Sequence, residues 1–453
     1  MLNTSQTTKT AFEQALLALA AYGDFNGISF GDTGGTSNAI LNSLKSGQNS
    51  TWLSQAVADY IAANFGVVQF QGSSSTGYSG TLFRRRVVAQ GDPTGGFAFA
   101  IRGTEPETRD LWVTDLLEVA PGGLAYSQTA DMLRQWDGIL AGAAGYAIDP
   151  SMLAVLQASK IDVTGHSLGG NLAVQFANSR ASVLSAAFTF NGAGNAYVDR
   201  QRIPASRISN FIGSGYPDIV SRTGALYGTT DRIFSESGTE FGLVATGHSI
   251  ANLVMGLGCE YLISLIDPTK SSLSARNLLE ALITRSNPST DSTYESFAAA
   301  LRTIFEMGAI AGEEQGDATI FQLIKDFEHA PNSTSRAQGR LISFADYDSA
   351  AAIAQLAFDA NTGAGNVGNA VRFSLVKGLT FAVSGSGTGV SASDSQLYDL
   401  SSQAFSSLYL NYRSAYMNIL VSANEKEATY GLNGVYQVGP SDSIYIDRET
   451  NKS

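Results

Sequence analysis

Apolar residues recur along the chain in two patterns, helical spacing and short continuous runs. Helical spacing predicts amphipathic helices, and it is found in the segments 10–22, 52–65, 109–118, 127–146, 168–180 and 250–266. Short apolar or β-branched runs predict strands, and they lie at 66–70, 81–90, 97–101, 160–164, 186–190 and 208–212. The first two strands flank a Gly- and Ser-rich loop and are expected to form an antiparallel hairpin. Residues 23–50, rich in Gly, Ser, Thr and Asn, predict a loop.

The order of these elements predicts the fold class. Strands alternate with helices through the middle of the chain, which is the pattern of an α/β protein whose mainly parallel sheet is covered on both faces. Beyond residue 270, helical spacing dominates at 272–330, 348–360 and 397–420, with a Gly/Ser loop at 384–395. We therefore expect an α/β domain over residues 1–270 and a mostly helical extension over 271–453, acting as a lid, a cover or a spacer.

Composition narrows the class of protein. Hydrophobic residues make up 44 % of the 453 positions, enough for a sizeable core, so intrinsic disorder is a poor description. The formal net charge is −12 and no basic run offsets it, which disfavours binding to nucleic acid or to anionic membranes. Cys259 is the only cysteine, so intrachain disulfides and Cys-x-x-Cys sites are excluded. The segment 250–266 is strongly apolar but contains Glu260, which predicts a buried helix and no transmembrane segment.

One short motif carries candidate chemistry. Gly165-His-Ser-Leu-Gly169 has the pattern G-x-S-x-G, in which the serine is exposed on a sharp turn between a strand and a helix. Gly27-Ile-Ser-Phe-Gly31 has the same pattern. Ser167 follows a predicted strand and precedes a predicted helix, whereas Ser29 lies among turn residues. We therefore expect Ser167 to be a nucleophile and Ser29 to be an ordinary loop residue.

A serine nucleophile needs a histidine base, and the chain offers three histidines. His166 occupies the variable position of the motif, where packing and a local hydrogen bond are the expected roles. His329 lies at a polar helix end and is expected to be solvated. His248 lies in a loop that leads into the apolar helix 250–266, where a base at the carboxyl edge of the sheet belongs. We therefore expect His248 to be the base.

The base in turn needs a carboxylate to orient it. Asp218 follows the strand 208–212 and so should lie at the carboxyl edge of the sheet. Asp199 and Asp231 also lie between the serine and the histidine in sequence. Asp199 is more typical of a helix or turn residue, and Asp231 of a turn residue or an ion-pair partner. Asp218 is the favoured acid.

Acyl transfer also needs hydrogen-bond donors for the oxyanion. One donor is expected from the backbone N–H of Leu168, directly after the serine. The other is expected from Thr104, through its N–H and its hydroxyl, because Arg102-Gly-Thr104 follows the strand 97–101. An ordinary glycine turn is the alternative at this position. The chemistry itself needs no metal or cofactor.

Six segments, in this order, resemble the class 3 lipases: FAIRGTE (99–105), DLWVTDL (110–116), VTGHSLGGNLA (163–173), FNGAGN (190–195), YPDIV (216–220) and GHSIANLV (247–254). The resemblance is strongest to the lipase domain of bacterial RTX lipases and phospholipases. It implies an α/β-hydrolase fold and hydrolysis of carboxylesters at a lipid–water interface. It also supports Ser167, Asp218 and His248 as the triad and Thr104 at the oxyanion site.

Several alternatives stay open beside a triacylglycerol lipase. Phospholipase A1 activity uses the same chemistry, and a catalytically idle adhesion or toxin module would keep only the hydrolase shell. The motif Gly363-Ala-Gly-Asn-Val-Gly368 matches a dinucleotide fingerprint but does not follow a predicted strand. Four apolar residues of the helix 109–118 are candidates for a lid or pocket wall, with core packing as the alternative: Leu111, Trp112, Leu116 and Leu117.

The resemblance also bears on export and calcium. Relatives of the RTX type leave the cell by a C-terminal signal, and the N-terminal segment here lacks the basic region and long apolar run of a secretory signal. We therefore expect an extracellular protein exported without an N-terminal signal, with a cytoplasmic location as the alternative. The glycine- and aspartate-rich repeats that bind calcium in such relatives are missing, so either the chain is shortened or it is a repeat-free relative. Bound calcium has no support in the sequence.

Overall fold

The computed structural model describes the following residues: 4–45, 55–103, 125–194, 202–214, 220–235, 248–280, 293–305, 317–329, 340–347, 367–377, 379–384, 398–399, 404–405, 434–437 and 443–446. The chain divides into two compact units. One unit is Lys9–Leu257, and the other is Gly258–Ser453 together with Met1–Thr8. The domain boundary expected at residue 270 stays a prediction.

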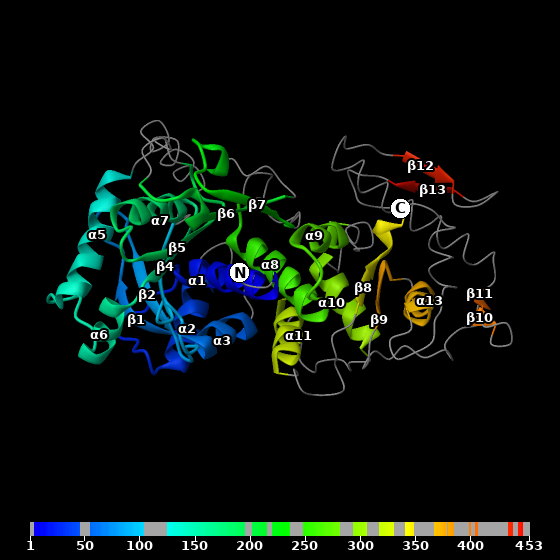
Figure 1. The fold of residues 1–453 in the computed structure, drawn as a ribbon, viewed down its shortest axis with the longest axis horizontal. Coiled ribbons are helices and arrows are strands. Elements are labelled where there is room, and N and C mark those ends of the chain that lie inside the picture. Colours follow the sequence, from blue (N-terminus) through cyan, green and yellow to red (C-terminus); the bar gives the residue numbers. More distant parts are fainter. Residues whose placement is uncertain are drawn as a thin grey trace. The chain divides into compact units, whose positions relative to one another are not determined.

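Seven strands of the first unit form one sheet, in the spatial order of the sequence (Figure 1). They are β1 Phe65–Gln71, β2 Gly80–Arg85, β3 Phe97–Ile101, β4 Ile161–His166, β5 Leu184–Phe190, β6 Ile208–Gly213 and β7 Thr229–Ile233. β1, β2 and β3 pair antiparallel, and β3 to β7 pair parallel. The expected hairpin and the expected mainly parallel sheet are both confirmed. Together with the strand–turn–helix at β4, this is the α/β-hydrolase fold.

The helices that belong to the first unit, wholly or in part, are α1 Thr4–Ala20, α2 Thr33–Lys45, α3 Gln55–Asn64, α5 Tyr126–Ala141, α6 Pro150–Ala158, α7 Leu168–Ser179 and α8 Ile250–Ile266. Residues 250–257 of α8 fall in this unit. Two 3-10 turns, Ala205–Arg207 and Val220–Arg222, complete the described elements of the unit. Within the part of the chain that the structure describes, no helix has the length and apolarity needed to cross a membrane.

Alternate residues of β4 face opposite sides of the sheet, as the two-residue period of a strand requires. Ile161 and Val163 join the apolar core with residues of α5, α6 and α7. Asp162 and Thr164 face α1 instead, because the Thr164 hydroxyl donates to the Gln14 carbonyl at 2.9 Å and the Gln14 amide donates to Asp162 at 3.3 Å. Helices therefore cover both faces of the sheet, as predicted.

The core on the α7 side is built around three aromatic side chains. The ring centroids of Phe99 and Phe176 are 5.4 Å apart, and those of Trp136 and Phe176 are 5.2 Å apart with the planes nearly perpendicular. All three are fully buried. Edge-to-face contacts of this kind add to the gain from apolar burial, and they hold α5 and α7 against β3.

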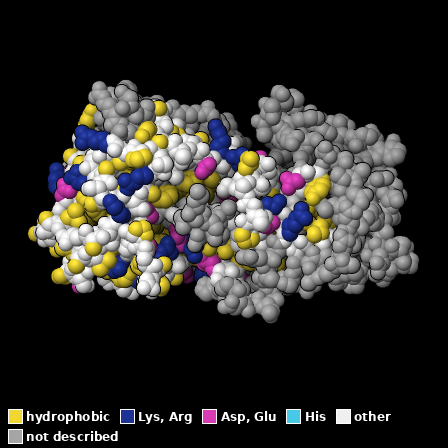
Figure 2. All heavy atoms as spheres, in the orientation of Figure 1, with side chains coloured by type: hydrophobic (Ala, Val, Ile, Leu, Met, Phe, Trp, Pro, Cys, Tyr) yellow, Lys and Arg dark blue, Asp and Glu magenta, His cyan; other side chains and the backbone are white. Residues whose placement is uncertain are grey.

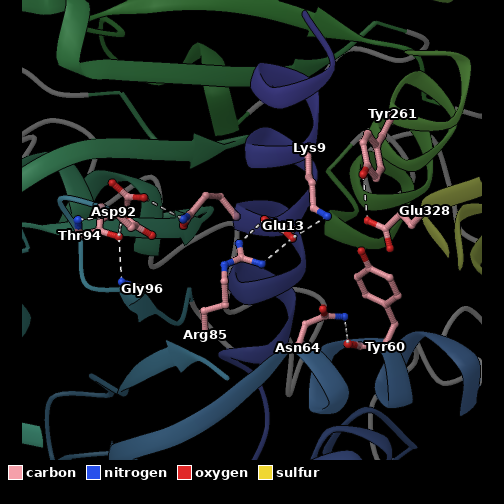
Figure 3. Close-up of polar contacts among 12 residues, drawn as sticks. Lys9, Glu13, Tyr60, Asn64, Arg85, Asp92, Thr94, Gly96, Tyr261 and Glu328 are labelled. Atoms are coloured by element: carbon pink, nitrogen blue, oxygen red, sulfur yellow. Dashed lines mark hydrogen bonds and ion pairs between the residues drawn. The ribbon is translucent and has the colours of Figure 1, made fainter. Parts of the chain in front are cut away.

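α1 is attached to the sheet by a buried ion pair (Figure 3). Glu13 is only 3 % exposed and accepts from both terminal nitrogens of Arg85 on β2, one of them at 2.8 Å. Lys9 lies one turn earlier on the helix, 3.9 Å from the same carboxylate. Burial disfavours the charge on Arg85, but its hydrogen bond to Glu13 and the charge of Glu13 outweigh this and raise the pKa of Arg85.

Two expectations for the first unit were wrong. Residues 23–50 were expected to form a loop, yet they contain α2. Asp32 accepts from the Gly35 N–H at 2.6 Å and so caps this helix, while Ile40 and Leu41 are buried on it. Tertiary burial therefore outweighs the poor helix propensity of the glycines at its start. Of the two roles expected for Asp231, a turn residue or an ion-pair partner, the turn is wrong: Asp231 lies in β7, a strand whose mostly exposed polar residues lack a strand-like pattern.

The described residues between 272 and 330 in the second unit are mostly helical, as expected, and form α9 Ser272–Glu280, α10 Thr293–Ile304 and α11 Asp317–His329. α13 Val367–Lys377 packs against β9 Phe381–Ser384, which pairs antiparallel with β8 Arg340–Ser343. A 3-10 turn, Phe344–Asp346, follows β8. Two further strand pairs are β10 Tyr398–Asp399 with β11 Ala404–Phe405, and β12 Gly434–Gln437 with β13 Ser443–Ile446.

The helix expected at 397–420 is wrong where the structure describes it. Tyr398 pairs with Phe405 across β10 and β11. Aromatic residues favour such cross-strand pairs, which here outweigh their helical spacing. The helices expected at 109–118 and 348–360 lie outside the described residues, as does the loop expected at 384–395 apart from Ser384.

Candidate active site

Ser167 lies on a sharp turn between β4 and α7. Its backbone has φ 58° and ψ −128°, a conformation that residues with a side chain rarely adopt. Three backbone hydrogen bonds hold this turn: the Ser167 N–H donates to the Phe190 carbonyl at 3.1 Å, and the Ser167 carbonyl accepts from Ala193 and Gly170 at 3.0 Å each. The strand–turn–helix context predicted for the motif is confirmed, and the alternative match at Ser29 lacks it.

The two outer glycines of the motif are required by close packing. A Cβ on Gly165 would lie 2.2 Å from the Gly169 carbonyl oxygen, and a Cβ on Gly169 would lie 2.2 Å from the Ile101 carbonyl oxygen. Both contacts are with backbone atoms, which cannot move aside cheaply. The motif glycines therefore let β3, β4 and α7 approach closely enough to form the turn.

The chain that leaves β3 passes directly against the serine. Gly103 follows this strand, and a Cβ on it would lie 3.0 Å from the Ser167 Cβ and 2.6 Å from the His166 carbonyl oxygen. Arg102-Gly-Thr104 was expected to supply an oxyanion donor, and the structure brings Gly103 to the serine. Thr104 lies outside the described residues.

Leu168, the other expected oxyanion donor, is the first residue of α7. The N–H groups of the first turn of a helix have no acceptor within the helix, and the helix dipole makes this end favourable for negative charge. The side chain of Leu168 is buried in the apolar core, so its backbone is held in place.

His248 lies next to the serine turn. Its ring is 4.6 Å from the ring of His166, centroid to centroid, with the planes inclined by 39°. The backbone carbonyl of His248 accepts a hydrogen bond from His166 Nε2 at 2.7 Å. His329, the rejected candidate, is the last residue of α11 in the other unit.

The expected acid, Asp218, lies outside the described residues, as does Asp199. The strand that leads toward Asp218 ends at Gly213, and the next residue, Ser214, donates its N–H to the Ile233 carbonyl at 2.8 Å. β5 lies between this strand and β4 in the parallel part of the sheet. The candidate lid residues at 111–117 also lie outside the described residues.

His166 is buried, with 6 % of its surface exposed. Packing and a local hydrogen bond were expected here; the burial confirms the packing, whereas the partners of the two ring nitrogens are not local. The Tyr22 hydroxyl lies 2.8 Å from His166 Nδ1, and the carbonyl of His248 lies at Nε2. Both partners are far away in sequence. His166 is the last residue of β4, and its side chain points to the α1 side of the sheet, where it meets them.

Two residues near the serine were missed by sequence reasoning. Tyr22 falls within the helix expected at 10–22, and nothing in the sequence indicated a role for it near the serine. Asn191 has φ 43°, and its side chain accepts from the Gly213 N–H at 3.1 Å, joining the ends of β5 and β6. An Asn-Gly pair directly after a buried strand marks such a left-handed residue, so this signal was available.

Nothing in the described part of the chain gathers three or more His, Cys, Asp or Glu side chains into a group that could hold a metal ion. Figure 2 shows Lys and Arg side chains in small separate groups on the face drawn, among apolar and neutral ones. The expectation that no cofactor is needed stays a prediction.

No protein-family model matches the sequence, and no curated protein matches it. The structure is similar to solved fungal lipases. A lipase from Rhizopus microsporus var. chinensis is 16 % identical, with 60 % of this chain and 90 % of that chain covered and a TM-score of 0.33. Lip2 lipase from Yarrowia lipolytica is 14 % identical, with 56 % and 93 % covered and a TM-score of 0.33. The propeptide complex of Rhizomucor miehei lipase is 15 % identical, with 60 % and 80 % covered and a TM-score of 0.29.

Proposed function

We propose that this protein is a serine carboxylester hydrolase that acts on lipid esters. The observation that carries the proposal is the strained turn of Ser167, with the ring of His248 packed against the neighbouring His166. A serine in this backbone conformation presents its hydroxyl away from the strand and helix that flank it. The strain is retained because three hydrogen bonds and the closely packed glycines hold the turn.

The mechanism is two-step acyl transfer. His248 removes the proton of the Ser167 hydroxyl as its oxygen attacks the ester carbonyl, and Asp218 stabilises the imidazolium that forms. The N–H of Leu168 and the N–H and hydroxyl of Thr104 bind the oxyanion. His248 then protonates the leaving alcohol, and water repeats the sequence to release the acid and regenerate the serine.

Substitution of the serine tests the proposal. Ser167→Ala should lower p-nitrophenyl ester hydrolysis by roughly 10³-fold or more, since nucleophile and base act as a unit. A fluorophosphonate probe should label the unsubstituted protein at Ser167 and should not label the variant. Ser29→Ala is the matched control, because Ser29 has the same motif without the strand–turn–helix, and it should keep full activity. Full activity in Ser167→Ala would refute the proposal.

A substrate panel then identifies the ester. Triolein, phosphatidylcholine and short p-nitrophenyl esters should be compared with and without calcium. Release of fatty acid from triolein supports a triacylglycerol lipase, and release from the first position of phosphatidylcholine supports phospholipase A1. Failure to cleave any of these esters, in a folded protein that the probe does not label, supports the idle module.

A further inference from the structure

We propose that Tyr22 and His166 are positioning residues that hold the His248 segment beside Ser167. The inference rests on the proposed function, and it assigns a role to the variable position of the serine motif. Three parts of the chain meet here. Tyr22 follows α1, His166 ends β4, and His248 precedes α8.

The two nitrogens of the His166 ring face different partners. Nδ1 lies 2.8 Å from the Tyr22 hydroxyl, and Nε2 lies 2.7 Å from the His248 carbonyl oxygen. A carbonyl oxygen can only accept, so Nε2 carries the hydrogen of the second bond. In the neutral ring, Nδ1 is then an acceptor, and the Tyr22 hydroxyl donates to it. The His248 carbonyl thereby fixes the tautomer, and the Tyr22 hydroxyl stabilises it by donating to Nδ1.

These two hydrogen bonds hold the backbone of His248 in place. They do not involve its imidazole ring, which carries out the proposed proton transfer. The two histidine rings pack at 4.6 Å, so the backbone bond and the ring contact together restrict where the imidazole of His248 can lie. A base must be within hydrogen-bond reach of its nucleophile, and a displacement of about 1 Å can cost roughly 10²-fold in rate. Holding the segment is therefore directly relevant to catalysis.

The Tyr22 side chain and the His166 backbone also lie against the segment expected to supply an oxyanion donor. A Cβ on Gly103 would lie 2.7 Å from the Tyr22 hydroxyl oxygen and 2.6 Å from the His166 carbonyl oxygen. The Tyr22 hydroxyl and the His166 backbone therefore lie against Gly103, the residue that precedes Thr104. They join the segments that carry the proposed nucleophile, base and oxyanion donor.

Four substitutions separate positioning from mere packing. His166→Phe keeps a ring but removes both hydrogen bonds, and Tyr22→Phe removes the hydroxyl alone. His166→Gln places an amide nitrogen at the position of Nε2 and can still donate to His248. His166→Asn is too short for this and places its amide at the position of Nδ1.

Kinetics on p-nitrophenyl butyrate give the first readout, with the melting temperature of each variant measured in parallel. We expect kcat to fall about tenfold in His166→Phe and His166→Asn and about threefold in Tyr22→Phe, with KM changed less than about twofold. His166→Gln should recover kcat to within about twofold of the unsubstituted enzyme. Equal kcat in all four variants would overturn the proposal, as would an equal loss in the Gln and Asn variants.

Tyr227→Phe is the matched control. The Tyr227 hydroxyl donates to the Ile203 carbonyl at 2.7 Å. Tyr227 lies just before the start of β7, whereas Ser167 follows the end of β4, so the two residues lie at opposite edges of the sheet. Its loss should lower the melting temperature about as much as Tyr22→Phe does, with kcat unchanged. A fall in kcat as large as that of Tyr22→Phe would mean that any lost tyrosine bond slows the enzyme, and the proposal would fail.

The tautomer gives a readout that does not depend on activity. The chain has only three histidines, so protein labelled with ¹⁵N-histidine gives few ring-nitrogen signals, and His166→Gln identifies those of His166. We expect His166 to carry its proton on Nε2, and to keep it there in Tyr22→Phe, because the His248 carbonyl can only accept. A proton on Nδ1 alone would overturn the proposal. Ser167→Ala separates the two hypotheses, because its full activity would refute the proposed function and leave the tautomer result standing.

Discussion

Gly103 and Ser167 lie so close that a Cβ on the glycine would be 3.0 Å from the Cβ of the serine. The same Cβ would be 2.6 Å from the His166 carbonyl oxygen, a backbone atom held in the sheet. Only a residue without a side chain allows the segment after β3 to approach the serine turn in this way. This contact is what brings the predicted oxyanion segment to Ser167.

Gly103→Ala should therefore lower activity more than stability. The added methyl group pushes the segment away from Ser167, and we expect kcat to fall at least about tenfold, with a loss of about 1–3 kcal/mol in the free energy of unfolding. Ester hydrolysis and urea denaturation measure the two effects. Gly31→Ala is the matched control, because nothing lies within 4 Å of a Cβ built there. If Gly103→Ala keeps the activity of this control, the close approach has no catalytic role.

The pH dependence of stability should carry the signature of Asp162. Burial, partly opposed by a hydrogen bond from Ser185, raises the pKa of this carboxyl to about 7 from its ordinary value of 3.8. Between these two pH values the folded state holds the proton and the unfolded state releases it. The contribution of Asp162 therefore becomes less favourable as the pH rises from about 4 to about 7, and is constant above this range.

Asp162→Asn removes the charge and should stabilise the protein above pH 7, by roughly 1–3 kcal/mol. The variant should also lose part of the pH dependence between about 4 and 7, while at pH 4 the two proteins should have similar stability. Thermal unfolding across this pH range measures both. A variant that is less stable at pH 8 would show that the carboxylate is better accommodated than its burial implies.

Breaking the ion pair between α1 and the sheet should be strongly destabilising. Glu13→Gln leaves Arg85 without the carboxylate that offsets the cost of its partial burial, and we expect a loss of about 2–4 kcal/mol in the free energy of unfolding. Asp137→Asn is the matched control, since Asp137 pairs with Arg180 in a more exposed position, and it should cost less than about 1 kcal/mol. Denaturation by urea compares them. Equal losses would show that burial does not distinguish the two pairs.

Chelation should leave ester hydrolysis unchanged. The proposed reaction moves protons between Ser167, His248 and water and needs no Lewis acid. Activity on a soluble p-nitrophenyl ester should be equal with excess EDTA and with calcium, and the melting temperature should be measured alongside it. A loss of activity at constant melting temperature would place a metal ion in the chemistry.

The sheet and the serine turn could be predicted because their signals are local. Continuous apolar runs such as 97–101 mark strands buried on both faces, and Gly165 and Gly169 mark the sharp turn between a strand and a helix. α2 and β7 were missed for the opposite reason. α2 begins with glycines and forms because its apolar face is buried, and β7 is polar and exposed, so the strand is formed by pairing with β6.

The sequence by itself determined the order of strands β1 to β6 and the strained turn at Ser167, because backbone sterics and apolar periodicity act over a few residues. It also favours His248 over His166 as the base, which stays a prediction. Only the tertiary structure decided that the Tyr22 hydroxyl meets His166 and that His166 binds the backbone of His248. These partners are separated by 144 and 82 positions, and no local pattern encodes such contacts. They depend on which side chains the folded sheet brings to one edge, a property of the packed chain as a whole.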